Sequence, residues 1–286
     1  MKIPVFSLAL CALTCVAAFA QKGKRIAVKP SDNVQKELQT ALIKIGDGDT
    51  LALAAGTYRF KVGLSMEGKN NVTIVGEGPD KTILSFAGQT VGAEGLIIKN
   101  GKNITLKDFA VEESKGDAVK VQEVDGITFD GIRVEWLGIP DSGNGAYGLY
   151  PVSCQNVLIQ NCVARGASDA GIYVGQSKHI IVANCLAEKN VAGIEIENSF
   201  YADVFNNVAT DNAGGILVFD MPGLKIKNGG FVRVFNNRCV ANNHPNFAPV
   251  GNIVAMVPSG TGVIVMACSN VEIFDNVIEA NATVNA

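Results

Sequence analysis

Hydrophobic residues alternate with variable ones in a phrase that recurs along the middle of the chain. Its first copies are GLYPVSC (148–154), GIYVGQS (171–177) and GIEIENS (193–199), so their starts at 148, 171 and 193 lie 23 and 22 residues apart. Two further copies are GILVFDM (215–221) and GVIVMAC (262–268). A period of two indicates a strand with one buried face, and this repeat is too short for a helix pair or a propeller blade. The pattern predicts the stacked turns of a parallel β-helix.

A second phrase, in which a turn residue precedes a short alternating strand, has eight copies. They start at Asn71, Asn103, Gly126, Asn156, His179, Tyr201, Phe231 and Asn270. Each copy should add one more strand to one turn of the coil. Asparagine tolerates a left-handed turn, and its amide can bond to the next amide in a stack. We therefore interpret the column five residues after the starts, from Asn103 onward, as an internal asparagine ladder: Asp108, Gly131, Asn161, Asn184, Asn206, Asn236 and Asp275.

A helical period precedes the repeats, because apolar residues recur at helical spacing from Val34 to Ile45 and Gly46 follows them. Such a short amphipathic helix is well placed to cover the open end of the first coil. We therefore predict an all-β fold, a right-handed single-stranded parallel β-helix of about eight coils over residues 49–286. The N-terminal segment 21–48 carries the capping helix.

Residues 1–20 have the character of a secretory signal peptide, with a basic Lys2, an apolar run and small residues before Gln21. The sequence thus predicts export to the periplasm or the extracellular space. A lipoprotein modified at Cys11 or Cys15 is a minor alternative. No apolar run after residue 20 is long enough to span a membrane.

Composition narrows the classes of partner. The 286-residue chain is 48% hydrophobic and has a net charge of −3, which allows a large core and argues against a nucleic-acid partner. Five cysteines follow the signal, and their spacing matches neither a zinc site nor a disulfide scaffold. We interpret them as small buried residues stacked in neighbouring coils: Cys154, Cys162, Cys185, Cys239 and Cys268.

Two long loops enter the same corner of different coils, just before the strand of the first phrase. They are residues 138–146 and 242–262, and the turns through Asp169 and Asn190 between them are short. We expect the loops to form the banks of a groove across the outer face of that strand.

Several segments resemble an exported bacterial family of parallel β-helix repeat proteins, related at the level of fold to pectate-lyase-like and mannuronan-epimerase-like enzymes. They are GAYGLYPVSCQNVLIQNC, GASDAGIYVGQS, NVAGIEIENS, GGILVFDMPGL and NNHPNFAPVGNIV. The resemblance implies the fold and export but no activity. The Asp-Pro-His pattern of alginate epimerases is absent, since Tyr150, Pro151 and Val152 are the nearest match. Family members continue with further coils, so we expect the C-terminal end to be incomplete or to meet a protein partner.

Two outward columns of side chains follow from the register of the repeats. Since Leu149, Ile172 and Ile194 should point inward, their neighbours face outward. The first column reads Lys120, Tyr150, Tyr173, Glu195 and Leu217. The second reads Gln122, Val152, Gly175, Glu197 and Phe219, where Gly175 should leave a notch.

The leading hypothesis is a protein that binds or acts on an extended polysaccharide or cell-envelope glycan, with uronate chemistry as the first expectation. Stacked tyrosines offer flat faces to sugars, and crowded carboxyls can serve as acid or base. Lys120 would neutralise a uronate carboxylate, and Tyr150, Tyr173 or His244 would move protons. Hydrolysis would instead use Glu195 and Asp169. No cofactor is required, although calcium could bind the acidic cluster.

Three other interpretations stay open. The outward tyrosines and glutamates could simply pack across rungs on a solvated sheet. The protein could be a non-catalytic scaffold in the cell envelope that binds a partner through its repeated face. Metal delivery would need the scattered Met221, Met256 and Met266.

Overall fold

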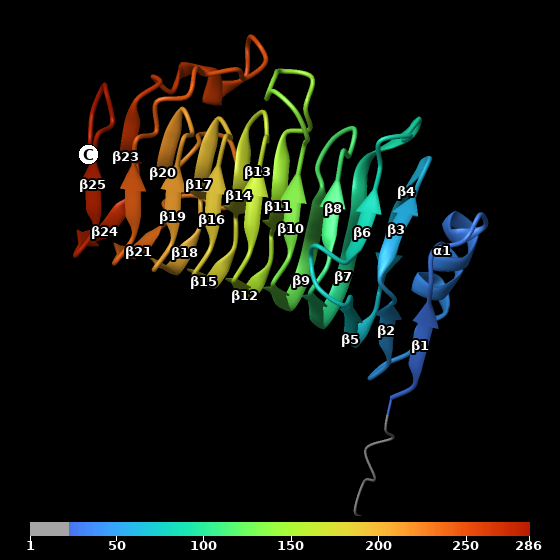
Figure 1. Cartoon of the computed structure of the whole chain (residues 1–286). Coiled ribbons are helices and arrows are strands. Elements are labelled where there is room, and N and C mark those ends of the chain that lie inside the picture. The colour runs from blue at the N-terminus through green and yellow to red at the C-terminus, as the bar shows by residue number, and fades with distance from the viewer. Residues whose placement is uncertain (1–22) are drawn as a thin grey trace, which may run out of the picture.

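The computed structural model describes residues 23–286 (Figure 1). The predicted signal peptide over residues 1–20, with Cys11 and Cys15, lies outside this range. Within it, no helix combines the length and the apolar character that a membrane span would need.

The described chain is a parallel β-helix with three sides, wound from short strands in about eight turns. The first side holds β4 (Val62–Glu67), β7 (Val91–Lys107), β9 (Val119–Asp130), β11 (Tyr147–Val152), β14 (Ala170–Gly175), β17 (Ala192–Glu197), β20 (Gly214–Phe219) and β23 (Thr261–Met266). The second side holds β1 (Arg25–Val28), β2 (Thr50–Leu53), β5 (Asn70–Val75), β12 (Gln155–Gln160), β15 (Lys178–Ala183), β18 (Phe200–Phe205), β21 (Gly230–Phe235) and β24 (Ser269–Phe274), with the ends of β7 and β9. The third holds β3 (Gly56–Arg59), β6 (Thr82–Ser85), β8 (Ala110–Glu112), β10 (Arg133–Glu135), β13 (Val163–Arg165), β16 (Leu186–Glu188), β19 (Val208–Thr210), β22 (Arg238–Val240) and β25 (Val277–Glu279).

Each strand pairs in parallel with the strand one turn away, as the repeat predicts. Leu149 aligns with Ile172, and Ile172 aligns with Ile194. These residues are fully buried in the continuous core between the three sides. The predicted all-β fold of stacked coils is therefore confirmed.

The predicted capping helix is α1 (Val34–Lys44), which lies at the N-terminal end of the coil in Figure 1. Its buried face carries Val34, Leu38 and Leu42, which join the core cluster of the first turns. The sequence did not indicate β1, which precedes the helix and pairs with β2. Helix and strand together cover apolar side chains that the first turn would otherwise expose.

All five cysteines among the described residues are free, and four of them are buried. This agrees with the interpretation of Cys162 and Cys185 as stacked core residues. Burial raises the pKa of the Cys154 thiol to about 11 and that of Cys239 to about 12, so both thiols stay protonated.

The predicted asparagine column consists of turn residues but does not form the internal ladder. Asn161, Asn184 and Asn206 have positive φ angles of 56°, 57° and 56°, and their side chains are exposed. The buried amides are those one residue later. The Asn207 backbone and side-chain amides both donate to Asn237 Oδ1 at 3.0 Å. The left-handed residue points out of the corner, and the residue after it points in.

A second buried ladder lies at the corner before the first side. It contains Asn190, Asn212, Asn242 and Asn281. The side-chain oxygens of Asn212, Asn242 and Asn281 each accept from the backbone amide of the asparagine one turn earlier, at 2.9 to 3.3 Å. The ladders keep the polar backbone of the turns satisfied without water, which lets the corners pack inside the coil.

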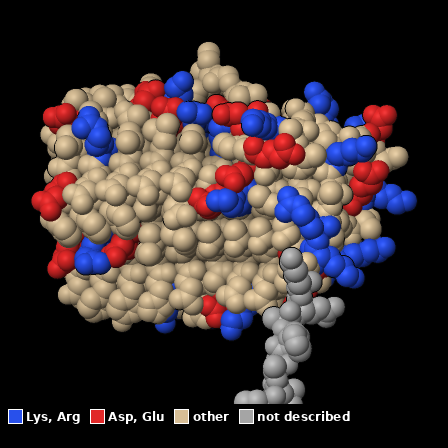
Figure 2. All heavy atoms as spheres, turned by 60° about the horizontal axis from the view of Figure 1, so that its bottom comes forward, with Lys and Arg blue, Asp and Glu red and all other residues tan. Residues whose placement is uncertain are grey.

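Charged side chains do not divide the surface into large regions of one sign. On the face shown in Figure 2, basic and acidic side chains are interspersed and uncharged residues cover most of the area. This agrees with the small net charge of the chain. A binding site must therefore be sought in local geometry.

Candidate functional site

The two predicted outward columns lie on the first side in the expected register. Tyr150 aligns with Lys120, and Tyr173 aligns with Glu195, which in turn aligns with Leu217. In the second column, Gly175 aligns with Glu197. Tyr173 and Glu195 thus share one face, as the sequence predicts.

This face is covered, whereas the sequence suggested an open groove. The loop between β22 and β23, which contains the 3-10 helix η1 (Ile253–Met256), folds over β14, β17 and β20. It forms an outer apolar cluster with the sheet: Ala170, Tyr173, Val191, Ala192, Ala213, Leu217 and Val254. Tyr173 and Glu195 are only 4% and 2% exposed as a result.

A glycine allows the loop to lie this close to the sheet. A Cβ atom at Gly214 would lie 2.9 Å from Cγ1 of Val257 and 3.1 Å from Cδ1 of Leu217. Any larger residue would push the loop outward. Ala170 and Ala192, at equivalent positions of neighbouring strands, are also small and leave space in the same way.

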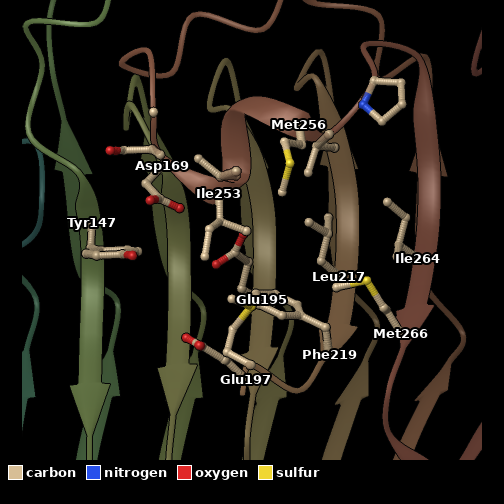
Figure 3. A pocket seen from close by; sticks show the side chains of 16 residues that line it. Tyr147, Asp169, Glu195, Glu197, Leu217, Phe219, Ile253, Met256, Ile264 and Met266 are labelled. Carbon is tan, nitrogen blue, oxygen red and sulfur yellow. The ribbon is translucent and has the colours of Figure 1, made fainter. Parts of the chain in front are cut away.

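Between the loop and the sheet is a cavity of about 540 Å³. Figure 3 shows the carboxyl groups of Asp169, Glu195 and Glu197 on one side of it, near Tyr147. Apart from Gly251 and Asn252, its other lining residues are apolar, and they come from β20, the segment just after it, β23 and the loop. The volume lies within the range of about 300–1,000 Å³ that is usual for small-molecule sites.

Burial raises the pKa values of all three carboxyl groups. Burial raises the pKa of Asp169 to about 7, the Tyr147 hydroxyl partly opposes the rise, and the charges of Glu197 and Asp117 add to it. Burial also raises the pKa of Glu195 well above its ordinary value, and the charges of Asp169 and Glu197 add to this rise. Glu195 receives no hydrogen bond from any described residue, so its carboxyl is free to meet a ligand in the cavity.

Three tyrosines pack beside the carboxyl groups. The ring centroids of Tyr147, Tyr150 and Tyr173 lie 4.5 to 4.9 Å apart. Tyr173 donates a hydrogen bond to Glu197, which lowers the pKa of Glu197 against the dominant effect of burial. The expected notch at Gly175 is filled by the Tyr173 ring, since a Cβ there would lie 2.2 Å from the Tyr173 hydroxyl oxygen. The tyrosine faces are therefore used in packing among themselves.

Lys120 lies on the predicted column but outside the cavity lining. Its Nζ atom is 3.3 Å from Asp117, 3.8 Å from Glu94 and 4.7 Å from the centre of the Tyr150 ring. The Lys120 ammonium group is therefore already paired with two acidic side chains and an aromatic face.

His244 belongs to the covering loop and also lies outside the cavity lining. Its Nδ1 atom is 2.9 Å from the Pro245 carbonyl, and its ring packs edge-on against Phe247 with 5.4 Å between centroids. The loop at 138–146 does not line the cavity either. Trp136 is a core residue whose Nε1 donates to the Ser114 carbonyl.

The sequence left open a calcium ion at the acidic cluster. Among residues 23–286, no group of three or more histidine, cysteine, aspartate or glutamate side chains has the arrangement of a metal site. Calcium at the acidic cluster remains a prediction from the sequence.

Sequence reasoning missed Tyr147 and the apolar wall of the loop, from Ile253 to Val257. Tyr147 aligns with Ala170, and the next residues along that rung are Ala192 and Gly214. A large residue followed by three small ones at equivalent positions was the available signal for a hollow there. The loop carries no periodic pattern and gave no such signal.

The raised carboxyl pKa values predict that stability decreases as pH rises. In the unfolded chain these groups ionise near about pH 4, whereas folded Asp169 keeps its proton to about pH 7. Between these values the folded state binds more protons, so the free energy of unfolding should fall with increasing pH, by on the order of a few kcal/mol. Urea unfolding at about pH 5 and about pH 8 measures this difference.

The variant Asp169→Asn should reduce that difference, whereas Asp211→Asn, at an exposed turn, should leave it unchanged. A free energy of unfolding that increases over the same window would contradict the assignment of buried, protonated carboxyls.

Comparison with known proteins identifies the fold family. The model of the family described as right handed beta helix region matches residues 62–229. The pre-neck appendage protein of Bacillus phage B103 is 24% identical in an alignment of 284 residues, which covers 79% of this chain and 32% of that protein. The present chain thus spans about a third of the length of this relative.

Solved structures show the same coil. An N-terminal fragment of bacteriophage phi29 gene product 12 superposes with a TM-score of 0.51 at 16% identity, covering 76% of this chain and 42% of that chain. PfbA, a surface adhesin of Streptococcus pneumoniae, gives a TM-score of 0.50 at 13% identity, covering 87% and 76%. At these identities the likeness concerns the fold alone. The family match, which extends over more than half of the sequence, confirms the predicted right-handed coil, and the chain belongs to the right-handed β-helix family.

Proposed function

We propose that this β-helix protein is carbohydrate-active, and that its cavity under the loop at 242–262 binds a neutral sugar and cleaves a glycosidic bond. The observation that carries the proposal is the cluster of Asp169, Glu195 and Glu197, whose pKa values are raised at one end of a ligand-sized cavity. Enzymes that hydrolyse glycosides usually use two carboxyl groups held in different protonation states as the acid and the base or nucleophile.

Glu195 suits the role of the acid because burial keeps it protonated. It would donate its proton to the glycosidic oxygen as the bond from that oxygen to the anomeric carbon breaks. Asp169, with a pKa of about 7, would accept a proton from the water whose oxygen bonds to the anomeric carbon. A base whose pKa lies near the working pH is the most effective kind.

The electrostatics of the cavity favour a neutral sugar over the uronate first expected from the sequence. Elimination or epimerisation of a uronate needs a positive group to neutralise the carboxylate. Lys120 is paired with Asp117 outside the cavity, and none of the described lining residues is basic. An anionic sugar would instead meet three acidic side chains.

We further propose that the protein is exported to the periplasm or the extracellular space. The supporting observations are the signal-like residues 1–20 and relatives whose names place them in a phage appendage and at a cell surface.

A non-catalytic scaffold is the second candidate, and the relatives favour it. The proteins with similar sequence or fold include an appendage protein and a surface adhesin. On this proposal the covered first side stabilises the coil, and other surfaces contact a glycan or protein partner.

Incubation of the purified protein with a panel of neutral oligosaccharides and polyuronates separates these candidates. We expect new reducing ends from a neutral glycan, formed at least about 10²-fold more slowly by the Glu195→Gln variant. Unsaturated products from a polyuronate would overturn the assignment of a neutral substrate. Binding of a glycan without any product across the whole panel would favour the scaffold.

A further inference from the structure

We propose that the sugar recognised by the cavity carries an aliphatic chain, so that the ligand is an alkyl or acyl glycoside. This inference rests on the proposed function, since it assigns the second half of the same cavity. The polar end is suited to a sugar ring, and the remaining surface needs an apolar occupant.

The cavity is divided along the direction of the stacked turns. Carboxyl groups lie over β14 and β17, whereas Leu217, Ile264 and Met266 lie over β20 and β23, as Figure 3 shows. Ten of the described lining residues have apolar side chains. A sugar alone would leave its hydroxyl groups unpaired against this wall, which is unfavourable. A sugar with an attached chain would match both ends.

Some of the apolar side chains that line the cavity are also open to solvent. Met256 is 75% exposed, and Ile253 and Met266 are each 49% exposed. Adjacent exposed apolar side chains that line a cavity are typical of a ligand-binding surface. An aliphatic chain would remove this surface from water, and each buried methylene group would tighten binding about fourfold.

Three methionines from separate segments line the cavity. Met221 follows β20, Met256 ends η1, and Met266 ends β23. Unbranched thioether side chains adapt to irregular apolar shapes, so they suit a flexible chain better than a rigid ring. The sequence offered these residues as scattered metal ligands, whereas in the structure all three line one cavity.

Isothermal titration with octyl β-glucoside and methyl β-glucoside, together with the matching galactosides and mannosides, tests the inference below the micelle concentration. We expect the octyl compound of the preferred sugar to bind at least about tenfold more tightly than the methyl compound, since several methylene groups are buried. Met256→Ser should weaken octyl binding about fivefold and leave methyl binding unchanged. Val250→Ser is the matched control, because Val250 is exposed in the same loop and does not line the cavity.

Each outcome decides between the inference and the function on which it rests. Equal affinity for methyl and octyl compounds would overturn the aliphatic chain and leave the sugar site standing. Octanol binding as tightly as the octyl glycosides would show an apolar site without sugar recognition, so the proposed function would fail. Absence of binding by every glycoside would overturn both. An octyl preference unaffected by Met256→Ser and Ile253→Ser would place the chain elsewhere and reject the inference.

Discussion

Replacing Glu195 with glutamine should lower the rate of glycoside hydrolysis by about 10²- to 10⁴-fold, the usual contribution of a positioned acid. The amide has the size of the acid but cannot donate the proton that the leaving oxygen needs. Because Glu195 is 2% exposed and receives no hydrogen bond from a described residue, the neutral amide should fit without breaking an existing contact.

The same substitution should maintain or increase the melting temperature at neutral pH. The folded protein must keep a proton on a buried carboxyl there, and glutamine removes that requirement. Initial rates and thermal unfolding of the same preparation measure both effects. Glu272→Gln, at an exposed position of β24, is the control and should change neither. A Glu195→Gln enzyme that hydrolyses the glycoside at the unmodified rate would exclude this residue as the acid.

The variant Asn207→Ala should lower the free energy of unfolding by about 3 kcal/mol, because it leaves several buried polar groups without partners. The Asn207 side chain accepts from the Cys185 amide at 2.9 Å and donates to the Val182 carbonyl at 2.9 Å. It also donates to Asn237 in the next turn. Urea unfolding monitored by circular dichroism gives the difference.

Asn206→Ala is a matched control one residue away. Asn206 is exposed at a φ of 56°, so alanine should cost only about 1 kcal/mol through backbone strain. A larger loss from Asn206→Ala than from Asn207→Ala would mean that the exposed column stabilises the coil, and would reject the ladder described above.

The fold could be predicted because every turn of the coil repeats the same contacts with the next turn. Each rung contacts the next one at a fixed spacing, so aligning GIYVGQS with GIEIENS also aligns Tyr173 with Glu195. The cap was predictable for the same reason, since the amphipathic period of α1 ends where the coil begins.

The ladder was placed one residue away from its true position for an equally local reason. Asparagine occupies both positions of the corner, as in Asn206 and Asn207 or Asn236 and Asn237. Composition alone does not tell which of the two points inward. The geometry does, because the residue with positive φ turns its side chain outward.

The covering of the site could not be read from the sequence. Residues 242–262 have no period, and their path depends on contacts such as that of Val257 with the rung at Gly214. These contacts convert the outward Glu195 into a buried acid. Side-chain identity on the face was therefore predictable, whereas solvent access and protonation were not.

The acidic residues of the cavity and the loop that covers them come from different parts of the chain. Asp169 and Glu195 belong to turns that precede residues 242–262 by two turns or more. A solenoid can form turn by turn, so these acids can first be arranged in water, ionised and fully hydrated. Once residues 242–262 cover the sheet, burial raises the pKa values of these acids. We therefore expect the last step of folding to be accompanied by proton uptake.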